Sequence, residues 1–217
     1  MAIITELQRQ AIDSETDVLS LLRSALLVAH KLDLEDFRLW LECELTGYTD
    51  KKYLPDYRLI KGELKAFDQY TGWIPVVVSH REMEDVLTKR EITESIASLY
   101  DLLKSEKARE GFVISIDGST ALKISQLTGI QTNYKIDVSS SSIANIVEQV
   151  KNKILEWSLE LEKNGIMGEN LSFTDVEKEK AREAPSITNF ITFNGDVSNS
   201  QIQQGSENSK QDLPITT

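Results

Sequence analysis

The chain has 217 residues, of which 40% are apolar and 27% charged, and this composition is sufficient for a buried core. Its formal net charge of −11 argues against a nucleic-acid partner, because phosphate binding requires clustered Lys and Arg. No apolar run reaches the length of a membrane span, and the first twelve residues lack the pattern of a secretory signal. Cys43 is the only cysteine, so no disulfide can form within the chain. We therefore expect a cytoplasmic protein without membrane contact.

The N-terminal segment 1–48 predicts a helical hairpin. Apolar residues recur at spacings of three and four along its first long helix, namely Val18, Leu22, Ala25, Ala29 and Leu32. Ser14 or Thr16 is suited to cap that helix, and Asp33 is suited to cap the next one after a turn at 31–33. Gly47 then marks the C-terminal end of the second helix.

The middle segment 49–139 predicts a small mixed sheet with short helices. Alternating or continuous apolar patterns with β-branched and aromatic residues indicate four strands, at 57–67, 73–79, 112–116 and 133–139. Helical spacing indicates three helices between them, at 82–88, 92–105 and 120–127. The fold class that follows is α+β, within a folded body of residues 1–184.

A long helix is predicted at 140–165. Its apolar residues alternate between spacings of four and three, and they are Ile143, Val147, Val150, Ile154, Trp157 and Leu161. Such a seam packs in the core of a helical bundle or pairs with a second copy as a homo-oligomer contact, and the pattern alone leaves both interpretations open. The charged run 171–184 predicts a short linker helix, and Pro185 the end of the body.

The tail 185–217 differs in composition, because it is rich in Asn, Gln, Ser and Gly and has a β-prone start. Extended copies stacked in register would form amide ladders and dry apolar stripes. The residues predicted to mediate this self-assembly are Val197, Asn199, Gln201, Ile202, Gln203, Gly205 and Asn208. The segment 199–205 also resembles the cores of amyloid signalling motifs, which implies templated assembly. A disordered polar tail and a strand pair docked on the body are the alternatives.

The sequence contains no recognisable catalytic, cofactor-binding or metal-binding motif. His30 and His80 are far apart, and Cys43 lies between Glu42 and Glu44, whose charges would raise its thiol pKa. The turn 117–120 resembles a phosphate-cradling loop only superficially, because it has one glycine and no lysine at the required offset. We therefore predict no catalytic residue, no cofactor and no metal.

Several segments, taken in order, resemble the AbiTii family of abortive-infection proteins. They are residues 18–48, 54–58, 146–168, 172–181 and the tail 199–211. The resemblance implies a bacterial antiphage role but supplies no catalytic residues. The prediction is a non-enzymatic interaction protein whose tail assembles with itself or recruits another defence protein. The alternative is a toxin-like effector enzyme, a nuclease or nucleotide hydrolase, whose site the sequence does not reveal.

Overall fold

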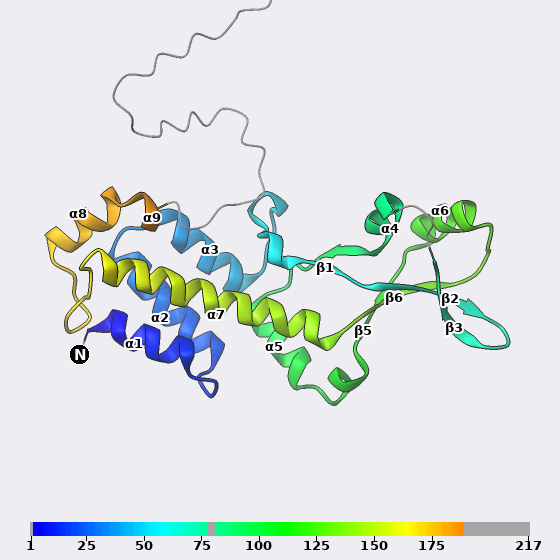
Figure 1. The fold of residues 1–217 in the computed structure, drawn as a ribbon, viewed down its shortest axis with the longest axis horizontal. Coiled ribbons are helices and arrows are strands. Elements are labelled where there is room, and N and C mark those ends of the chain that lie inside the picture. The colour runs from blue at the N-terminus through cyan, green and yellow to red at the C-terminus, as the bar shows by residue number, and fades with distance from the viewer. Residues whose placement is uncertain (1, 78–80, 189–217) are drawn as a thin grey trace, which may run out of the picture.

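The computed structural model describes residues 2–77 and 81–188. These residues form an elongated body with a helical bundle at one end and β-sheet structure at the other (Figure 1). The α+β class predicted from the sequence is confirmed, including the N-terminal helices, the small sheet with short helices and the long C-terminal helix. The predicted assembly residues, from Val197 to Asn208, lie outside the described residues.

The N-terminal segment forms three helices where a hairpin of two was predicted. They are α1 (Ile3–Ile12), α2 (Val18–Lys31) and α3 (Glu35–Thr46). Asp17, and not Ser14 or Thr16, caps α2 by accepting a 3.0 Å hydrogen bond from the Ser20 N–H. Asp33 adopts a positive φ of 56° in the turn and does not cap α3, because Leu34 occupies that position.

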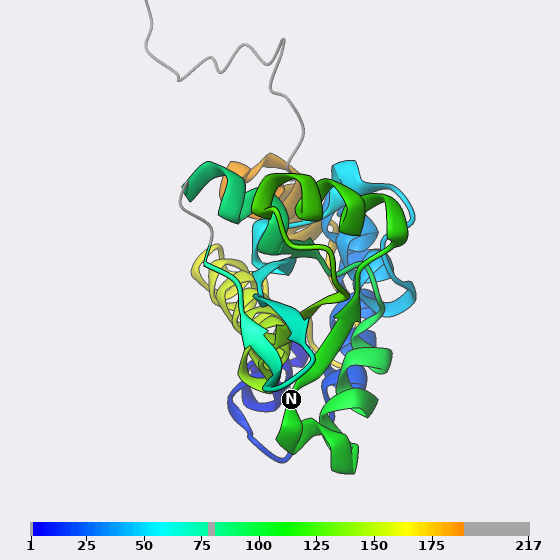
Figure 2. The ribbon, with the colours of Figure 1, turned by 90° about the vertical axis from the view of Figure 1, so that its right-hand side faces the viewer.

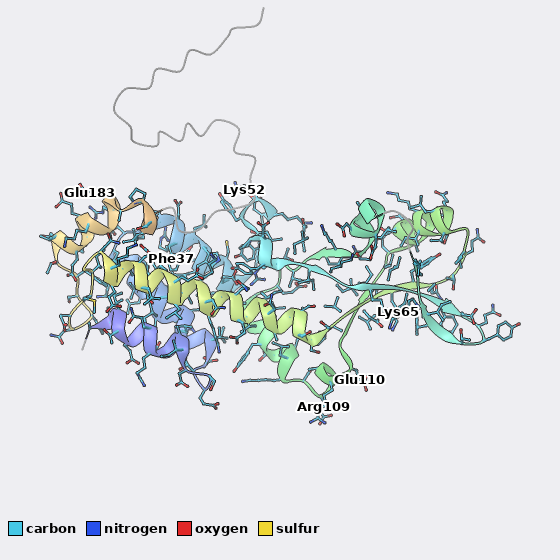
Figure 3. All side chains as sticks on the ribbon, in the orientation of Figure 1. Phe37, Lys52, Lys65, Arg109, Glu110 and Glu183 are labelled. Atoms are coloured by element: carbon cyan, nitrogen blue, oxygen red, sulfur yellow. The ribbon has the colours of Figure 1, made fainter. Side chains whose placement is uncertain are left out.

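Helix α7 (Ser140–Lys163) is the centre of the bundle, where it contacts α1, α2, α5 (Ile96–Lys104) and α9 (Pro185–Thr188). Its six predicted seam residues are at most 4% exposed. Phe37 of α3 lies inside the bundle (Figure 3) and stacks on Trp157 with ring centroids 3.8 Å apart. The seam residues therefore pack within the chain's own core, as in the first of the two interpretations that the pattern left open.

Two short helices, α8 (Asp175–Glu183) and α9 (Pro185–Thr188), complete the bundle end. Thr174 and Glu177 form a capping box, and the Glu177 carboxylate also accepts hydrogen bonds from the N–H groups of Met167 and Gly168, at 2.9 and 3.0 Å. Ile187 is fully buried. Packing of the chain thus continues past Pro185, where a composition shift had suggested the end of the body.

The described residues of the sheet end form two antiparallel sheets. Strands β1 (Leu59–Lys61) and β4 (Lys89–Glu91) form a pair, and the four-stranded sheet has the order β3-β2-β6-β5. The latter strands are β2 (Glu63–Asp68), β3 (Gly72–Pro75), β5 (Phe112–Ser115) and β6 (Tyr134–Val138). Helices α4 (Arg81–Thr88) and α6 (Gly118–Thr128) lie together above the sheet in Figure 2. Three 3-10 turns join these parts, η1 (Lys51–Tyr53), η2 (Asp56–Arg58) and η3 (Glu106–Glu110).

The strand predicted at 57–67 is divided at Gly62 between β1 and β2. A Cβ atom at Gly62 would lie 2.3 Å from Cγ2 of Ile136 and 2.9 Å from the carbonyl oxygen of Asp137. The Gly62 N–H donates instead to the carbonyl of Thr88, at the end of α4. The missing side chain therefore allows the backbone to approach β6 closely, where the chain passes from one sheet to the other.

Candidate functional site

Cys43 has the surroundings of an inert thiol. Burial, together with the charges of Glu44 and Glu42, raises the pKa of the Cys43 thiol, in the direction that the sequence predicted. A thiol with a raised pKa carries little thiolate at neutral pH, and the thiolate is the nucleophilic form. His30 is exposed on α2, and His80 lies outside the described residues.

A buried ion pair between Glu44 of α3 and Arg58 of η2 was not predicted. Both side chains are fully buried. The Arg58 guanidinium donates two hydrogen bonds to the Glu44 carboxylate, from Nε to Oε1 at 3.1 Å and from Nη2 to Oε2. Its Nη1 donates to the carbonyl oxygens of Ile92 and Glu94, at 3.0 and 2.6 Å. The pair therefore ties α3 to the segment that leads from β4 into α5.

Two tyrosines complete the hydrogen bonding of this carboxylate. The hydroxyls of Tyr48 and Tyr57 each donate to Oε1 of Glu44 at 2.6 Å, and Trp40 Nε1 donates to the Tyr57 hydroxyl at 2.8 Å. Burial first, and then the charge of Glu44, raises the pKa of both tyrosines, so both hydroxyls remain protonated donors. Because its charges and donors are engaged with one another, this cluster has the character of a structural support, not a reactive site.

The sequence did contain a signal for this cluster. Glu44 follows Phe37 by seven residues and Leu41 by three, so it lies on the apolar face of α3. A carboxylate on a core-facing position requires a buried partner, because an unpaired buried charge is costly. The partner, Arg58, belongs to the segment 54–58, and Glu44 belongs to 18–48. Both segments are among those that carry the family resemblance.

A feature suited to binding is an open pocket of about 1030 Å³ at the sheet end. Its walls come from η1, the β1–β4 pair, the ends of α4 and β5, and α6. The charged residues that line it comprise four cations, Lys51, Lys89, Arg90 and Lys123, and two carboxylates, Glu91 and Asp117. We refer to it as the β4–α6 pocket.

The charges of this pocket are unequally paired. Lys51 and Lys89 form ion pairs with Glu91 and Asp85, at 2.5 and 2.9 Å. Within the described part of the chain, Arg90 and Lys123 have no carboxylate at ion-pair distance. Burial lowers the pKa of Arg90, and the charge of Asp117 opposes that shift. Arg90 donates from Nη1 to the carbonyl oxygen of Lys89 at 2.6 Å, and its other N–H groups, with the Lys123 ammonium, remain available to an anion.

Asp117 is occupied as the N-cap of α6. Its carboxylate accepts hydrogen bonds from the side chains of Ser119 and Thr120 and from their N–H groups, the latter two at 3.0 Å each. These donors hold the pKa of Asp117 far below its ordinary value. The turn 117–120 is thus a capped strand-to-helix connection, in agreement with its interpretation from the sequence, and the N–H groups of Ser119 and Thr120 are not free to cradle a phosphate.

The AbiTii family model matches residues 2–186. The chain belongs to the AbiTii family. The match spans the described body from α1 to the start of α9, so it includes both the Glu44–Arg58 pair and the β4–α6 pocket. No curated protein and no solved structure matches the chain.

Two negative findings concern the described residues alone. In 2–77 and 81–188, no helix has the length and apolar character needed to cross a membrane. Within the same ranges, no three His, Cys, Asp or Glu side chains gather as ligands for a metal ion.

Proposed function

We propose that this AbiTii-family protein acts in phage defence by abortive infection, as an interaction protein with a non-enzymatic body and an assembling tail. Family membership over residues 2–186 is the observation that carries the antiphage role. The tail would bring copies of the chain together or recruit another defence protein. Residues from Val197 to Asn208 would form the contacts between stacked copies.

Two observations support a binding role for the body. The most deeply buried charges, Glu44 and Arg58, neutralise each other and are closed off by tyrosine hydroxyls. The Cys43 thiol has a raised pKa, which opposes a nucleophilic role. Recognition and assembly, in contrast to bond cleavage, require no reactive group of this kind.

The test compares two tail variants that carry the same chemical change. Ile202→Asp places a charge in the predicted stack, where each copy would repel the next, whereas Leu213→Asp places the same charge outside the predicted assembly residues. Light scattering of the full-length proteins over a concentration series measures assembly, and plaque counts on bacteria expressing each variant measure defence.

We expect the wild type and Leu213→Asp to form large species and to reduce plaque numbers, and Ile202→Asp to do neither. If Ile202→Asp assembles and protects as the wild type does, the assembling role of the tail is refuted. If no variant, the wild type included, reduces plaque numbers against a panel of phages, the antiphage role is refuted.

A further inference from the structure

The β4–α6 pocket carries a local excess of positive charge in a chain with a net charge of −11. Arg90 extends from β4 and Lys123 from α6, so the two cations come from different elements and converge on one opening. Two cations that line one opening both attract an anion that lies between them. A guanidinium beside an ammonium suits a phosphate, which offers several acceptor oxygens.

Apolar side chains line the same pocket and remain unusually exposed. Leu59 of β1 is 44% exposed, Val86 of α4 is 78% exposed and Leu127 of α6 is 54% exposed. Three large aliphatic side chains around one opening are suited to cover an apolar or planar group. The pocket volume of about 1030 Å³ corresponds to the upper end of small-molecule sites, which span roughly 300–1,000 Å³.

A second pocket, of about 1130 Å³, provides the contrast. Residues of β2, of the segment 108–111 and of the start of α7 line it, and they include Lys65, Arg109 and Glu110, which are labelled in Figure 3. Its lysines are engaged by carboxylates, since Lys65 pairs with Asp137 and Lys61 pairs with Glu84, each at 2.9 Å. Carboxylates also outnumber cations among its lining residues. A preference for anions is therefore a property of the β4–α6 pocket and not of every opening in the molecule.

We propose that the β4–α6 pocket binds a nucleoside phosphate, with its phosphates on Arg90 and Lys123 and its base against Leu59, Val86 and Leu127. This site does not depend on the assembling tail, so either proposal can fail without the other. It also differs from a loop that cradles phosphate with backbone N–H groups, because Asp117 occupies the N–H groups of Ser119 and Thr120 at the start of α6. Affinity then comes from the two side-chain cations and from apolar contact with the base.

The experiment is calorimetric titration of the full-length protein with ADP, GDP, CDP and UDP, and with pyrophosphate and the four nucleosides. Vesicles of phosphatidylglycerol test whether a lipid phosphate is the source of the anion. We expect at least one nucleoside diphosphate to bind with a Kd below about 1 mM, more tightly than pyrophosphate or its own nucleoside. The Arg90→Gln/Lys123→Gln variant should bind it at least about tenfold more weakly.

The matched control is Arg23→Gln/Lys31→Gln, which removes the same two kinds of cation from α2 in the helical bundle. This control should bind as the wild type does. Lys123→Glu is a further variant, and it changes an exposed residue whose replacement leaves the core untouched. Thermal unfolding of each variant verifies that the body is intact.

Several outcomes would overturn the proposal. They are the absence of binding by all four nucleoside diphosphates, equal affinity for pyrophosphate, equal weakening by the control substitutions, and binding to vesicles alone. Retained affinity in a folded Lys123→Glu protein would likewise place the phosphate elsewhere. Tighter binding of one nucleoside diphosphate, lost in the pocket variants and kept in the control, supports the site and identifies its base.

Discussion

Replacing Glu44 by alanine is expected to destabilise the body more than the loss of any exposed charge. The substitution removes the carboxylate that accepts from Arg58, Tyr48 and Tyr57, and it leaves a fully buried guanidinium without a counter-charge. Breaking a buried ion pair by removing one partner costs about 3–5 kcal/mol. In a folded body of this size, each kcal/mol lowers the Tm by roughly 2–4 °C, so we expect a decrease of roughly 6–20 °C.

Glu42→Ala is the matched control, because Glu42 lies on the same helix and pairs with Arg38 at 2.9 Å on a partly exposed surface. Its removal should cost no more than about 0.5 kcal/mol. Urea titration followed by tryptophan fluorescence measures both free energies of unfolding. A Glu44→Ala protein within about 1 kcal/mol of the wild type would refute the reasoning.

The double variant separates the pair from its surroundings. Glu44→Ala and Arg58→Met should each be strongly destabilising. The double variant should lose less stability than the sum of the two single losses, because removing both partners leaves no buried charge unpaired. The double variant should still be less stable than the wild type. The hydroxyls of Tyr48 and Tyr57 would lack the carboxylate that accepts from them, and the carbonyl oxygens of Ile92 and Glu94 would lack the guanidinium that donates to them. Strict additivity would show that the buried charges do not interact as described.

Two further predictions concern a capping carboxylate and a glycine. Burial acts to raise the pKa of Glu177, but hydrogen bonds from the N–H groups of Gly168, Thr174 and Met167 hold it at about 2, below the ordinary 4.5. Stability that depends on a lowered pKa is present above pH 4.5 and is lost as the pH falls toward 2. The Glu177→Gln variant should therefore lose about 1 kcal/mol of unfolding free energy at pH 7, and this loss should disappear as the pH falls toward 2 in urea titrations. A loss of the same size at every pH would contradict this reasoning. Gly62→Ala should lower the free energy of unfolding by about 1–3 kcal/mol, because the new Cβ would overlap Ile136. Gly118→Ala is the control, because its Cβ would meet no atom within 4 Å, and it should be neutral in the same assay. Equal effects of the two substitutions would contradict the close approach at Gly62.

The helices were largely predictable because their cores follow a repeating pattern. The spacing of Ile143 to Leu161 located α7, and all six seam residues are buried, but the pattern alone could not distinguish a bundle core from a contact between copies. That distinction depends on which other helices pack against the seam. The turn before α3 was misjudged for a local reason, since Asp33 adopts a positive φ and leaves the capping position to Leu34.

The candidate sites were much less predictable, because they are made by residues that only the fold brings together. The β4–α6 pocket combines Lys51, Arg90 and Lys123 from three segments, none of which forms a motif by itself. The Glu44–Arg58 pair was partly accessible to sequence reasoning, since a carboxylate on an apolar helix face requires a partner. The identity of that partner could not be predicted, because fourteen positions separate Glu44 and Arg58 and no regular spacing links them.

The location of these features determines how loss of function in this protein should be interpreted. Substitutions at Glu44 or Arg58 would reduce any activity by destabilising the body, although neither residue would need to contact a ligand. Lys123 and the tail residue Ile202 differ in this respect, because a change at either alters no buried residue of the described core. A phenotype is therefore evidence for the pocket or for the tail only in a variant whose unfolding temperature matches that of the wild type. With that condition met, loss of nucleotide binding with intact assembly would place ligand recognition in the body and assembly in the tail.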